Sequence, residues 1–375
     1  MKTAIVCDWL THYGGAERVI EEIYALFPSP IYTLFYKKEN FEDIKLGEAK
    51  IFTSPLQKFS FLREKDYKNF FLVVFPFFIE QFDLSDYDVI ISSSHCVAKG
   101  IITKPYQLHI SYVHTPMRYI WDMYFQYLEF SGLKKGLKGL IAKVIIHHLR
   151  KWDVLSSFRV DYFIANSKFV ASRIKKIYRR DAEVIYPPVD VEKFLKYKRK
   201  PQDYYVVISR LVAYKRIDLI IEAFRYLKGR KLLVIGNGPE MRRLKDLAKN
   251  LKNIEFLGEV RGNKVAEYLS KAKAFVYAAE EDFGIVMAEA QAAGLPVITY
   301  SKGSAKEIIK DLETGILYNE QSPKAIRAAI RKFESIEDKF DEKKIRKNAK
   351  RFDKNIFREK FKEFVEEKIS KHFSN

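Results

Sequence analysis

Residues 273–294 read KAFVYAAEEDFGIVMAEAQAAG and contain a complete strand, loop and helix. The apolar run AFVYAA is typical of a buried strand, and the helical pattern of GIVMAEAQAA ends at Gly294. Glu281 lies in the loop between them, just after the carboxyl end of the strand. Open α/β sheets bind their ligands at that edge. This stretch therefore predicts a mostly parallel sheet with a ligand site at the loop.

Two series of short apolar runs alternate with helical patterns along the chain. A polar segment near residues 190–203 separates the two series. This alternation predicts an α/β protein with two doubly wound, Rossmann-like domains that face a central cleft. We expect strands within residues 3–9, 87–94, 108–114 and 161–167 in the first series, and within 204–211, 231–238, 254–260, 273–280 and 296–303 in the second.

The chain length also supports two domains. At 375 residues the chain exceeds the size of one ordinary core. We expect an N-terminal domain over residues 1–190 and a C-terminal domain over 191–355. The remaining segment, 356–375, has the apolar stripe of an amphipathic helix, which consists of Ile356, Phe357, Phe361, Phe364, Val365 and Ile369.

The net charge of +19 predicts an acidic partner: nucleic acid, an anionic membrane or a phosphate-bearing substrate. The sequence contains no nucleic-acid-binding module, so we expect no nucleic acid partner. Only two cysteines, Cys7 and Cys96, are present, and the N-terminus MKTAIVCDWL does not resemble a secretion signal. We therefore expect a cytoplasmic protein. The longest apolar run, FFLVVFPFFI at 70–79, is too short to span a membrane.

Glu281 and Glu289 are the acidic residues of most interest in the opening stretch. The first amides of the helix, from residues 283–285, can hold an anion such as a diphosphate. Glu289 lies further along the helix, where its carboxylate can accept hydrogen bonds from ribose hydroxyls. In the alternative interpretation, Glu281 and Asp282 only cap the helix and Glu289 faces solvent. The many alanines around Glu289 argue against that exposure, and we expect Asp282 to cap the helix in either case.

Two cations follow the first strand of the second series, in ISRLVAYKRID. Arg210 and Lys215 are expected at the same sheet edge as Glu281, where they could clamp a diphosphate. Alternatively, both are ordinary surface cations of a lysine-rich protein. Two glycine loops, Gly14-Gly15 and Gly236-Asn237-Gly238, also follow strands and could bring the backbone close to a phosphate, although any turn can require glycine.

Two histidines end neighbouring strands of the first series. His114, followed by a loop with Arg118, is a candidate catalytic or positioning group, and His95 is a weaker candidate on the acceptor side. Both could equally be structural. The pair Asp86 and Asp88 resembles a metal-binding Asp-x-Asp, but it precedes a strand and lies at the wrong edge. We expect no metal site.

Together these residues resemble family 4 of the retaining glycosyltransferases, which have the GT-B fold. The resemblance covers nearly the whole chain and implies that the final helix crosses back to the N-terminal domain. The finer pattern of SSSHCVAKG, SYVHTPMRYIWDMY and EEDFGIVMAEAQAAG is most similar to mannosyltransferases of O-antigen and surface-polysaccharide assembly. The markers are Glu281-x7-Glu289, Arg210-x4-Lys215, GNGPE at 236–240, FIANSKFVASRI at 163–174, YPPVDVEKF at 186–194 and Gly14-Gly15.

The resemblance implies transfer of a hexose, mannose from GDP-mannose, to a lipid-linked or glycan acceptor, without a metal. The sequence departs from the family pattern at Gly303-Ser304, where many members have two glycines, and at Thr115, where an aspartate is common. The implied catalytic residues are Arg210, Lys215, Glu281 and His114; the implied donor-binding residues are Gly14, Gly15, Gly236, Asp282, Phe283, Gly284, Ile285 and Glu289; His95 and Arg118 lie on the acceptor side, and Gly258–Val260 borders the base.

The segment LKKGLKGLIAKVIIHHLRKWD at 133–153 alternates cations with leucines and isoleucines and has no acid before Asp153. This pattern is typical of helices that lie on anionic membranes, and it predicts a peripheral position on the inner face of the cell membrane. The run at 70–79 could add an insertion surface. Three alternatives remain: a UDP-sugar donor, a nucleotide-sugar epimerase of the same fold, and a nucleic-acid binder suggested only by charge.

Overall fold

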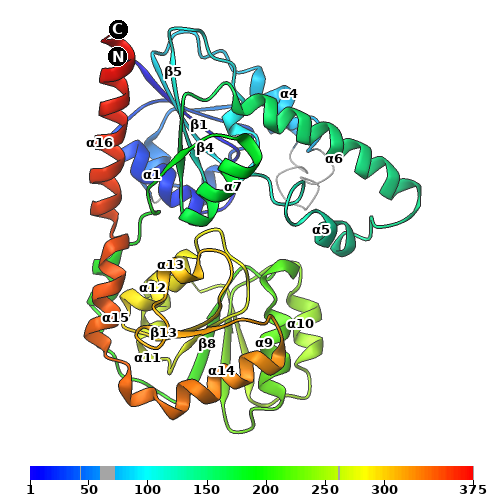
Figure 1. The fold of residues 1–375 in the computed structure, drawn as a ribbon, viewed down its shortest axis with the longest axis vertical. Coiled ribbons are helices and arrows are strands. Elements are labelled where there is room, and N and C mark those ends of the chain that lie inside the picture. Colours follow the sequence, from blue (N-terminus) through cyan, green and yellow to red (C-terminus); the bar gives the residue numbers. More distant parts are fainter. Residues whose placement is uncertain (43, 60–71, 261, 375) are drawn as a thin grey trace. The chain divides into compact units, whose positions relative to one another are not determined.

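The chain forms two compact units in the computed structural model, which describes residues 1–42, 44–59, 72–260 and 262–374. The N-terminal unit comprises Met1–Pro188 together with Phe357–Asn375, and the C-terminal unit comprises Val189–Ile356. Each unit is built on its own parallel sheet (Figure 1). Because the final residues return to the first unit, the backbone passes between the units twice.

The N-terminal sheet has seven strands in the order β3-β2-β1-β4-β5-β6-β7, and all neighbours are parallel. Ile5 of the central strand β1 lies opposite Ile31 of β2 and Ile91 of β4. The strands β2, β3 and β7 were not predicted from the sequence, since three residues are too few to show a period. The strands are β1 (Thr3–Cys7), β2 (Ile31–Thr33), β3 (Ile51–Thr53), β4 (Val89–Ser94), β5 (Leu108–Val113), β6 (Tyr162–Ala165) and β7 (Ala182–Val184).

The crossover helices of this unit follow the expected local rules. Ser167 accepts a hydrogen bond from the Val170 amide and is the N-cap of α7. Of the apolar run at 70–79, residues 70 and 71 lie outside the described residues, and the rest leads into α4. The helices are α1 (Gly15–Leu26), α4 (Phe75–Glu80), α5 (Tyr124–Phe130), α6 (Gly136–Ser157), α7 (Lys168–Tyr178) and α16 (Lys354–Phe373).

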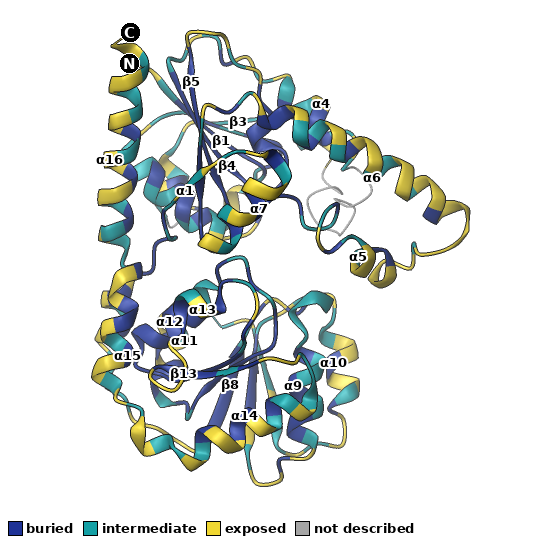
Figure 2. Cartoon of the chain, viewed as in Figure 1, coloured by how far each residue is buried: buried dark blue, intermediate teal, exposed yellow. Residues whose placement is uncertain are grey.

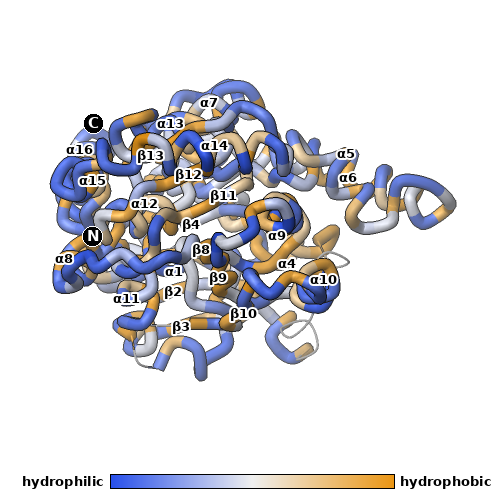
Figure 3. Tube along the Cα trace, turned by 90° about the horizontal axis from the view of Figure 1, so that it is seen from below, coloured by the Kyte–Doolittle hydropathy of each residue, from blue (hydrophilic) through white to orange (hydrophobic). Residues whose placement is uncertain are grey.

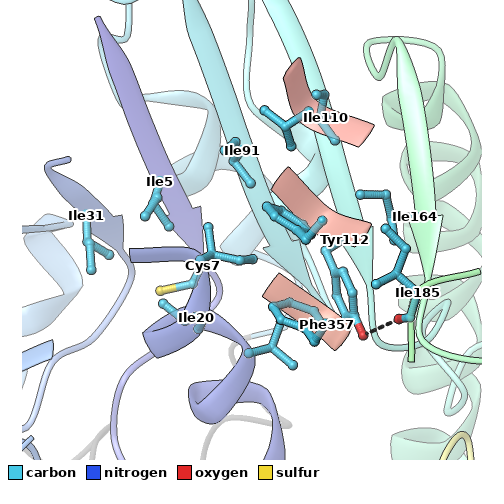
Figure 4. Packing of buried hydrophobic residues seen from close by; sticks show 14 of the residues in the cluster. Ile5, Cys7, Ile20, Ile31, Ile91, Ile110, Tyr112, Ile164, Ile185 and Phe357 are labelled. Carbon is cyan, nitrogen blue, oxygen red and sulfur yellow. Dashed lines mark hydrogen bonds between the residues drawn. The ribbon is translucent and has the colours of Figure 1, made fainter. Parts of the chain in front are cut away.

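The final helix completes the core of the N-terminal unit. Phe357, Phe361 and Val365 of α16 are buried in a cluster with Ile5, Ile110 and other strand residues. Figure 4 shows Phe357 beside Tyr112, whose hydroxyl donates a 2.9 Å hydrogen bond to the Ile185 carbonyl. The predicted apolar stripe of this helix therefore faces the N-terminal sheet.

The C-terminal sheet has six parallel strands in the order β10-β9-β8-β11-β12-β13. Figure 3 shows the apolar character of its inner strands β8 and β9. The short strand β13 was not predicted. The strands are β8 (Tyr204–Ile208), β9 (Lys231–Ile235), β10 (Ile254–Gly258), β11 (Phe275–Tyr277), β12 (Val297–Tyr300) and β13 (Gly315–Tyr318). The helices are α8 (Val191–Leu195), α9 (Ile217–Arg225), α10 (Met241–Leu247), α11 (Asn263–Lys271), α12 (Ile285–Ala292), α13 (Ala305–Ile308), α14 (Pro323–Ser335) and α15 (Glu342–Ala349).

Both sheets reverse their strand order once, which confirms the doubly wound prediction. The reversal lies between β1 and β4 in the N-terminal unit and between β8 and β11 in the C-terminal unit. Loops at the carboxyl ends of these strand pairs diverge to opposite faces of the sheet and leave a crevice for ligands. Among the described residues, no helix has the length and apolar character that crossing a membrane requires.

Candidate functional site

A buried ion pair lies at the reversal point of the C-terminal sheet. Lys215, in the loop after β8, donates its ammonium to Glu281 Oε1, in the loop after β11. Tyr277, the last residue of β11, donates its hydroxyl to the same carboxylate oxygen. The Lys215 and Glu281 side chains are only 16% and 11% exposed. The carboxylate of the opening stretch is therefore compensated by a cation 66 residues away.

The electrostatics of this triad keep the lysine charged. Burial disfavours the ammonium of Lys215, but Glu281 together with Tyr277 and Tyr214 more than offsets this effect and holds the lysine pKa well above its usual value. Burial, reinforced by Glu281, also raises the pKa of Tyr277, so its hydroxyl keeps its proton and can donate. An anion that reaches this edge would therefore meet a protonated, already oriented lysine whose charge is shared with Glu281.

The loop that carries Glu281 is fixed by the neighbouring loop after β12. The Ser304 amide donates a 3.0 Å hydrogen bond to the Glu281 carbonyl, and the Ser304 hydroxyl donates one of 2.5 Å to the Phe283 carbonyl. A β-carbon on Gly303 would lie 2.3 Å from that Glu281 carbonyl, so only glycine fits there. Gly303-Ser304 departs from the family pattern, and the structure shows that Ser304 holds this loop.

Helix α12 begins differently from the prediction. Its N-cap is Gly284, which has φ of 84° and no side-chain capping hydrogen bond, so the prediction that Asp282 caps the helix was wrong. Glycine adopts this left-handed conformation without steric cost, whereas Asp282 stands too early to reach the N-cap position. Glu289 is only 6% exposed, and residues 287–292 are all buried (Figure 2). The solvent-facing interpretation of Glu289 is thereby excluded.

Arg210 and Lys215 have contrasting environments, although both follow β8. The Arg210 side chain is exposed and forms no hydrogen bond or ion pair with the described part of the chain. The structure thus brings Lys215 together with Glu281 and leaves Arg210 unengaged near the same strand end. Such a guanidinium is available for a ligand.

Gly236 is required by the packing of the chain itself. Its φ is 134°, and a β-carbon there would lie 1.8 Å from the Ser209 carbonyl at the end of β8. Gly238 stands similarly close to the Leu211 carbonyl, at 2.3 Å. The loop after β9 therefore rests on the loop that carries Arg210. This contact explains the glycine without any reference to a ligand.

His114 and His95 lie together in the N-terminal unit, at the ends of β5 and β4. Their ring centroids are 6.3 Å apart. His114 Nε2 is 2.8 Å from the Ser93 hydroxyl, and burial, with the nearby His95, lowers the His114 pKa to about 3. His114 is therefore neutral at physiological pH. It can exchange hydrogen bonds but does not supply a positive charge.

Asp8, which was not predicted as a site residue, organises this cluster. It follows β1, is 1% exposed, and accepts hydrogen bonds from the amides of residues 95–98. Its Oδ2 is also 3.1 Å from His95 Nδ1. An acid at the end of the first strand was the available signal. Asp8 thus fixes the loop that presents His95.

The other N-terminal candidates have local structural contacts. Gly14 is the N-cap of α1, and its amide donates a 3.0 Å hydrogen bond to Glu17 Oε2. Arg118 Nε lies 3.4 Å from Asp122 Oδ2. Among the described residues, no group of three or more His, Cys, Asp or Glu side chains could hold a metal ion.

Comparisons with known proteins agree with this architecture. Residues 190–352 match the family described as Glycosyl transferases group 1. An uncharacterized glycosyltransferase of Methanocaldococcus jannaschii is 28% identical over 231 residues, which cover 61% of this chain and 62% of that protein. A GDP-mannose-dependent alpha-(1-6)-phosphatidylinositol monomannoside mannosyltransferase of Mycobacterium tuberculosis is 27% identical over 192 residues, covering 44% and 50%. The chain thus spans only about half to three fifths of these curated relatives.

Among solved structures, Anabaena HepE in complex with UDP-glucose superposes with a TM-score of 0.71 at 16% identity, and the match covers 98% of this chain and 100% of HepE. Such a likeness establishes the fold over the whole chain. Residues 190–352 are therefore similar to the group 1 glycosyl transferases, and the chain as a whole has the GT-B fold.

Proposed function

We propose that this protein is a retaining glycosyltransferase that moves a hexose from a nucleotide sugar to a lipid-linked or glycan acceptor. The observation that carries the proposal is the buried Lys215–Glu281 pair at the reversal point of the C-terminal sheet. Fixed charge at this position suits a ligand with a diphosphate and neighbouring hydroxyl groups. The group 1 match over residues 190–352 supports the same conclusion.

The chemistry follows from how charge moves when a glycosyl–phosphate bond breaks. Negative charge develops on the diphosphate and positive charge on the sugar. Lys215, Arg210 and the first amides of α12 supply fixed positive charge for the leaving group, where one such donor is worth about 3 kcal/mol of barrier. The departing phosphate oxygen would take the proton of the attacking hydroxyl on the same face, which gives retention.

Acidic groups would bind the two sugars of the donor. Glu289, buried in α12, would accept hydrogen bonds from ribose hydroxyls, and Glu281 would contact hydroxyls of the transferred hexose. His114 would face the anomeric carbon as a neutral ring, because its pKa is about 3. Gly15 and Gly236 would border the diphosphate, and Gly258–Val260 the base.

For the donor we propose GDP-mannose, with a UDP-sugar as the alternative. Support for GDP-mannose comes from the residue pattern and from the mycobacterial relative named as GDP-mannose-dependent. Support for UDP comes from HepE, which binds UDP-glucose in a similar fold. We further propose a role in surface-polysaccharide assembly on the inner face of the cell membrane.

The direct test is a thermal-shift screen of GDP-mannose, UDP-glucose and an ADP-sugar with the wild type and two arginine variants. Arg210→Ala is the informative change because this side chain is exposed and unengaged, so the fold should tolerate it. We expect one sugar nucleotide to stabilise the wild type and to bind at least about tenfold more weakly to the variant, as loss of a charge-assisted hydrogen bond predicts. Arg242→Ala, exposed on α10, is the matched control and should bind normally.

Two outcomes would contradict this proposal. The first is the absence of a response to any nucleotide sugar. The second is conversion of the donor to an isomer without an acceptor, which would identify an epimerase instead. NMR of the product's anomeric proton would test retention directly.

A further inference from the structure

Helix α6 has a firmly anchored inner half. Asp153 is fully buried, and its carboxylate accepts hydrogen bonds of 2.7 Å from both Lys99 Nζ and Trp121 Nε1. One turn earlier, Leu149 is buried in the core, and Ile145 packs against the same cluster. The C-terminal half of α6 is therefore anchored in the core of the N-terminal unit.

The outer half of α6 exposes an apolar stripe. Leu137, Leu140, Ile141 and Val144 recur at the i, i+3, i+4 and i+7 spacing of one helical face. They are 74%, 59%, 51% and 51% exposed, respectively. Figures 1 and 3 show this half of α6 extending outward from the N-terminal unit, and Figure 2 shows its exposure. An apolar face that covers no core in the described structure suggests an external partner.

Cations flank this stripe. At 100° per residue, Lys138 and Lys143 lie on opposite sides of it. Lys134 and Lys135 precede the helix, and no acidic residue occurs from 130 to 152. The preceding helix α5 has two exposed aromatic side chains of its own, Phe125 at 79% and Phe130 at 51%. The chemistry of this surface is thus apolar at the centre and positively charged at its borders.

We propose that the outer half of α6 binds an anionic lipid bilayer. Its apolar stripe would enter the boundary between headgroups and acyl chains, and the flanking lysines would contact lipid phosphates. The charge pattern favours lipid over a protein groove, since a bilayer presents anionic groups on both sides of an inserted stripe. The inference rests on the proposed function in one respect only: membrane binding would bring the protein to a lipid-linked acceptor. The binding itself does not depend on the donor.

The test is cosedimentation of the full chain with vesicles of phosphatidylcholine containing 30% phosphatidylglycerol, and with vesicles of phosphatidylcholine alone. Three double variants are compared with the wild type. Ile141→Ser with Val144→Ser removes half of the stripe, and Lys138→Glu with Lys143→Glu reverses the flanking charge. Lys324→Glu with Lys332→Glu makes the same charge change on exposed positions of α14 and is the matched control.

We expect the wild type to bind the anionic vesicles at low salt and to bind phosphatidylcholine vesicles much more weakly. Each flanking lysine is worth about fivefold in affinity, so the Lys138 and Lys143 variant should bind at least roughly 25-fold more weakly. The stripe variant should also lose binding, whereas the α14 control should retain it.

Three results would overturn the proposal: no wild-type binding to anionic vesicles, an equal loss in the α14 control, or a stripe variant that binds normally. A change of oligomeric state in the stripe variant without any change in vesicle binding would instead identify a contact between copies. The thermal shift with nucleotide sugars should be the same in all these variants. That comparison separates failure of this inference from failure of the proposed function.

Discussion

At the scale of single residues, the most informative feature is that Glu281 Oε1 accepts hydrogen bonds from both Lys215 and Tyr277. If Lys215 turns part of its charge toward a bound diphosphate, Glu281 remains buried and needs another donor. Tyr277 supplies it, because burial and the carboxylate together keep its hydroxyl protonated. Tyr277 is therefore a positioning residue in the proposed site.

Tyr277→Phe tests this role. A hydrogen bond to a charged group is worth about 1.5–3 kcal/mol, so the free energy of unfolding of the C-terminal unit should fall by about that amount. In a Glu281→Gln background the same change should have a much smaller effect, since the carboxylate is gone. Chemical denaturation of the four proteins gives this cycle, and equal losses in both backgrounds would show that the hydroxyl does not act through Glu281. Tyr226→Phe, at an exposed ring, is the control.

Two histidines of the N-terminal unit predict acid sensitivity. Burial lowers the pKa of His109 to about 4, and burial with His95 lowers that of His114 to about 3, against about 6.5 in an unfolded chain. Below pH 6.5 the unfolded state therefore binds protons that the native state refuses. The contribution of these two histidines to the free energy of unfolding is complete above pH 6.5. It is lost as the pH falls toward the native pKa values, by up to about 1.4 kcal/mol per pH unit for each histidine.

Urea unfolding between pH 7.5 and 5.5 measures this loss. Tryptophan fluorescence reports on the right unit, since Trp9, Trp121 and Trp152 all belong to the N-terminal unit. His114→Gln should make the pH dependence shallower, whereas His148→Gln, at an exposed position, should leave it unchanged. Identical slopes in all three proteins would refute the assignment.

At the scale of elements, the loops after β8 and β9 contact each other and support the proposed donor site. Gly236 allows the loop after β9 to touch the Ser209 carbonyl, one residue before Arg210. A side chain here would push two loops of the site apart. The strands were predictable from their apolar runs, but this contact between their ends depends on their pairing.

Gly236→Ala should therefore be costly. It combines a left-handed φ of 134° with a β-carbon 1.8 Å from a carbonyl oxygen, so we expect a loss of more than about 2 kcal/mol in stability and weaker nucleotide binding. Gly229→Ala is the matched control: its φ is also positive, at 80°, but nothing lies within 4 Å of the added carbon. Its cost should be only about 1–2 kcal/mol. Thermal unfolding compares the two, and equal losses would contradict the predicted clash.

At the scale of the whole molecule, α16, which lies near the C-terminus, supplies part of the core of the N-terminal unit. Residues Lys354–Ile356 belong to the C-terminal unit, while Phe357, Phe361 and Val365 of the same helix are buried against the N-terminal sheet. The N-terminal unit thus lacks part of its core until the last residues of the chain are in place.

Phe361→Ala should for this reason destabilise the N-terminal unit, although it lies close to the C-terminus. Phe361 is fully buried, and truncation of such a ring costs about 3–5 kcal/mol. The urea unfolding transition that tryptophan fluorescence reports should shift to a lower urea concentration. Phe373→Ala, at a 38% exposed ring, should leave it nearly unchanged, and a loss of equal size there would argue against the core role of α16.

The amino-acid sequence by itself determined the α/β class, the two series of strands and the loops where ligand-binding groups stand. These features follow from local periodicity and from the rule that parallel strands present their carboxyl ends at one edge. Glu281, Lys215 and His114 were found in this way.

Only the tertiary structure decided which of these groups meet. Lys215 pairs with Glu281 because β8 and β11 are neighbours, and Asp8 holds residues 95–98 because β1 lies beside β4. Likewise, the pattern of α6 shows apolar residues, but packing alone reveals that its outer stripe is exposed. Strand order and the choice of a buried face are set by contacts between distant segments, which no local pattern encodes.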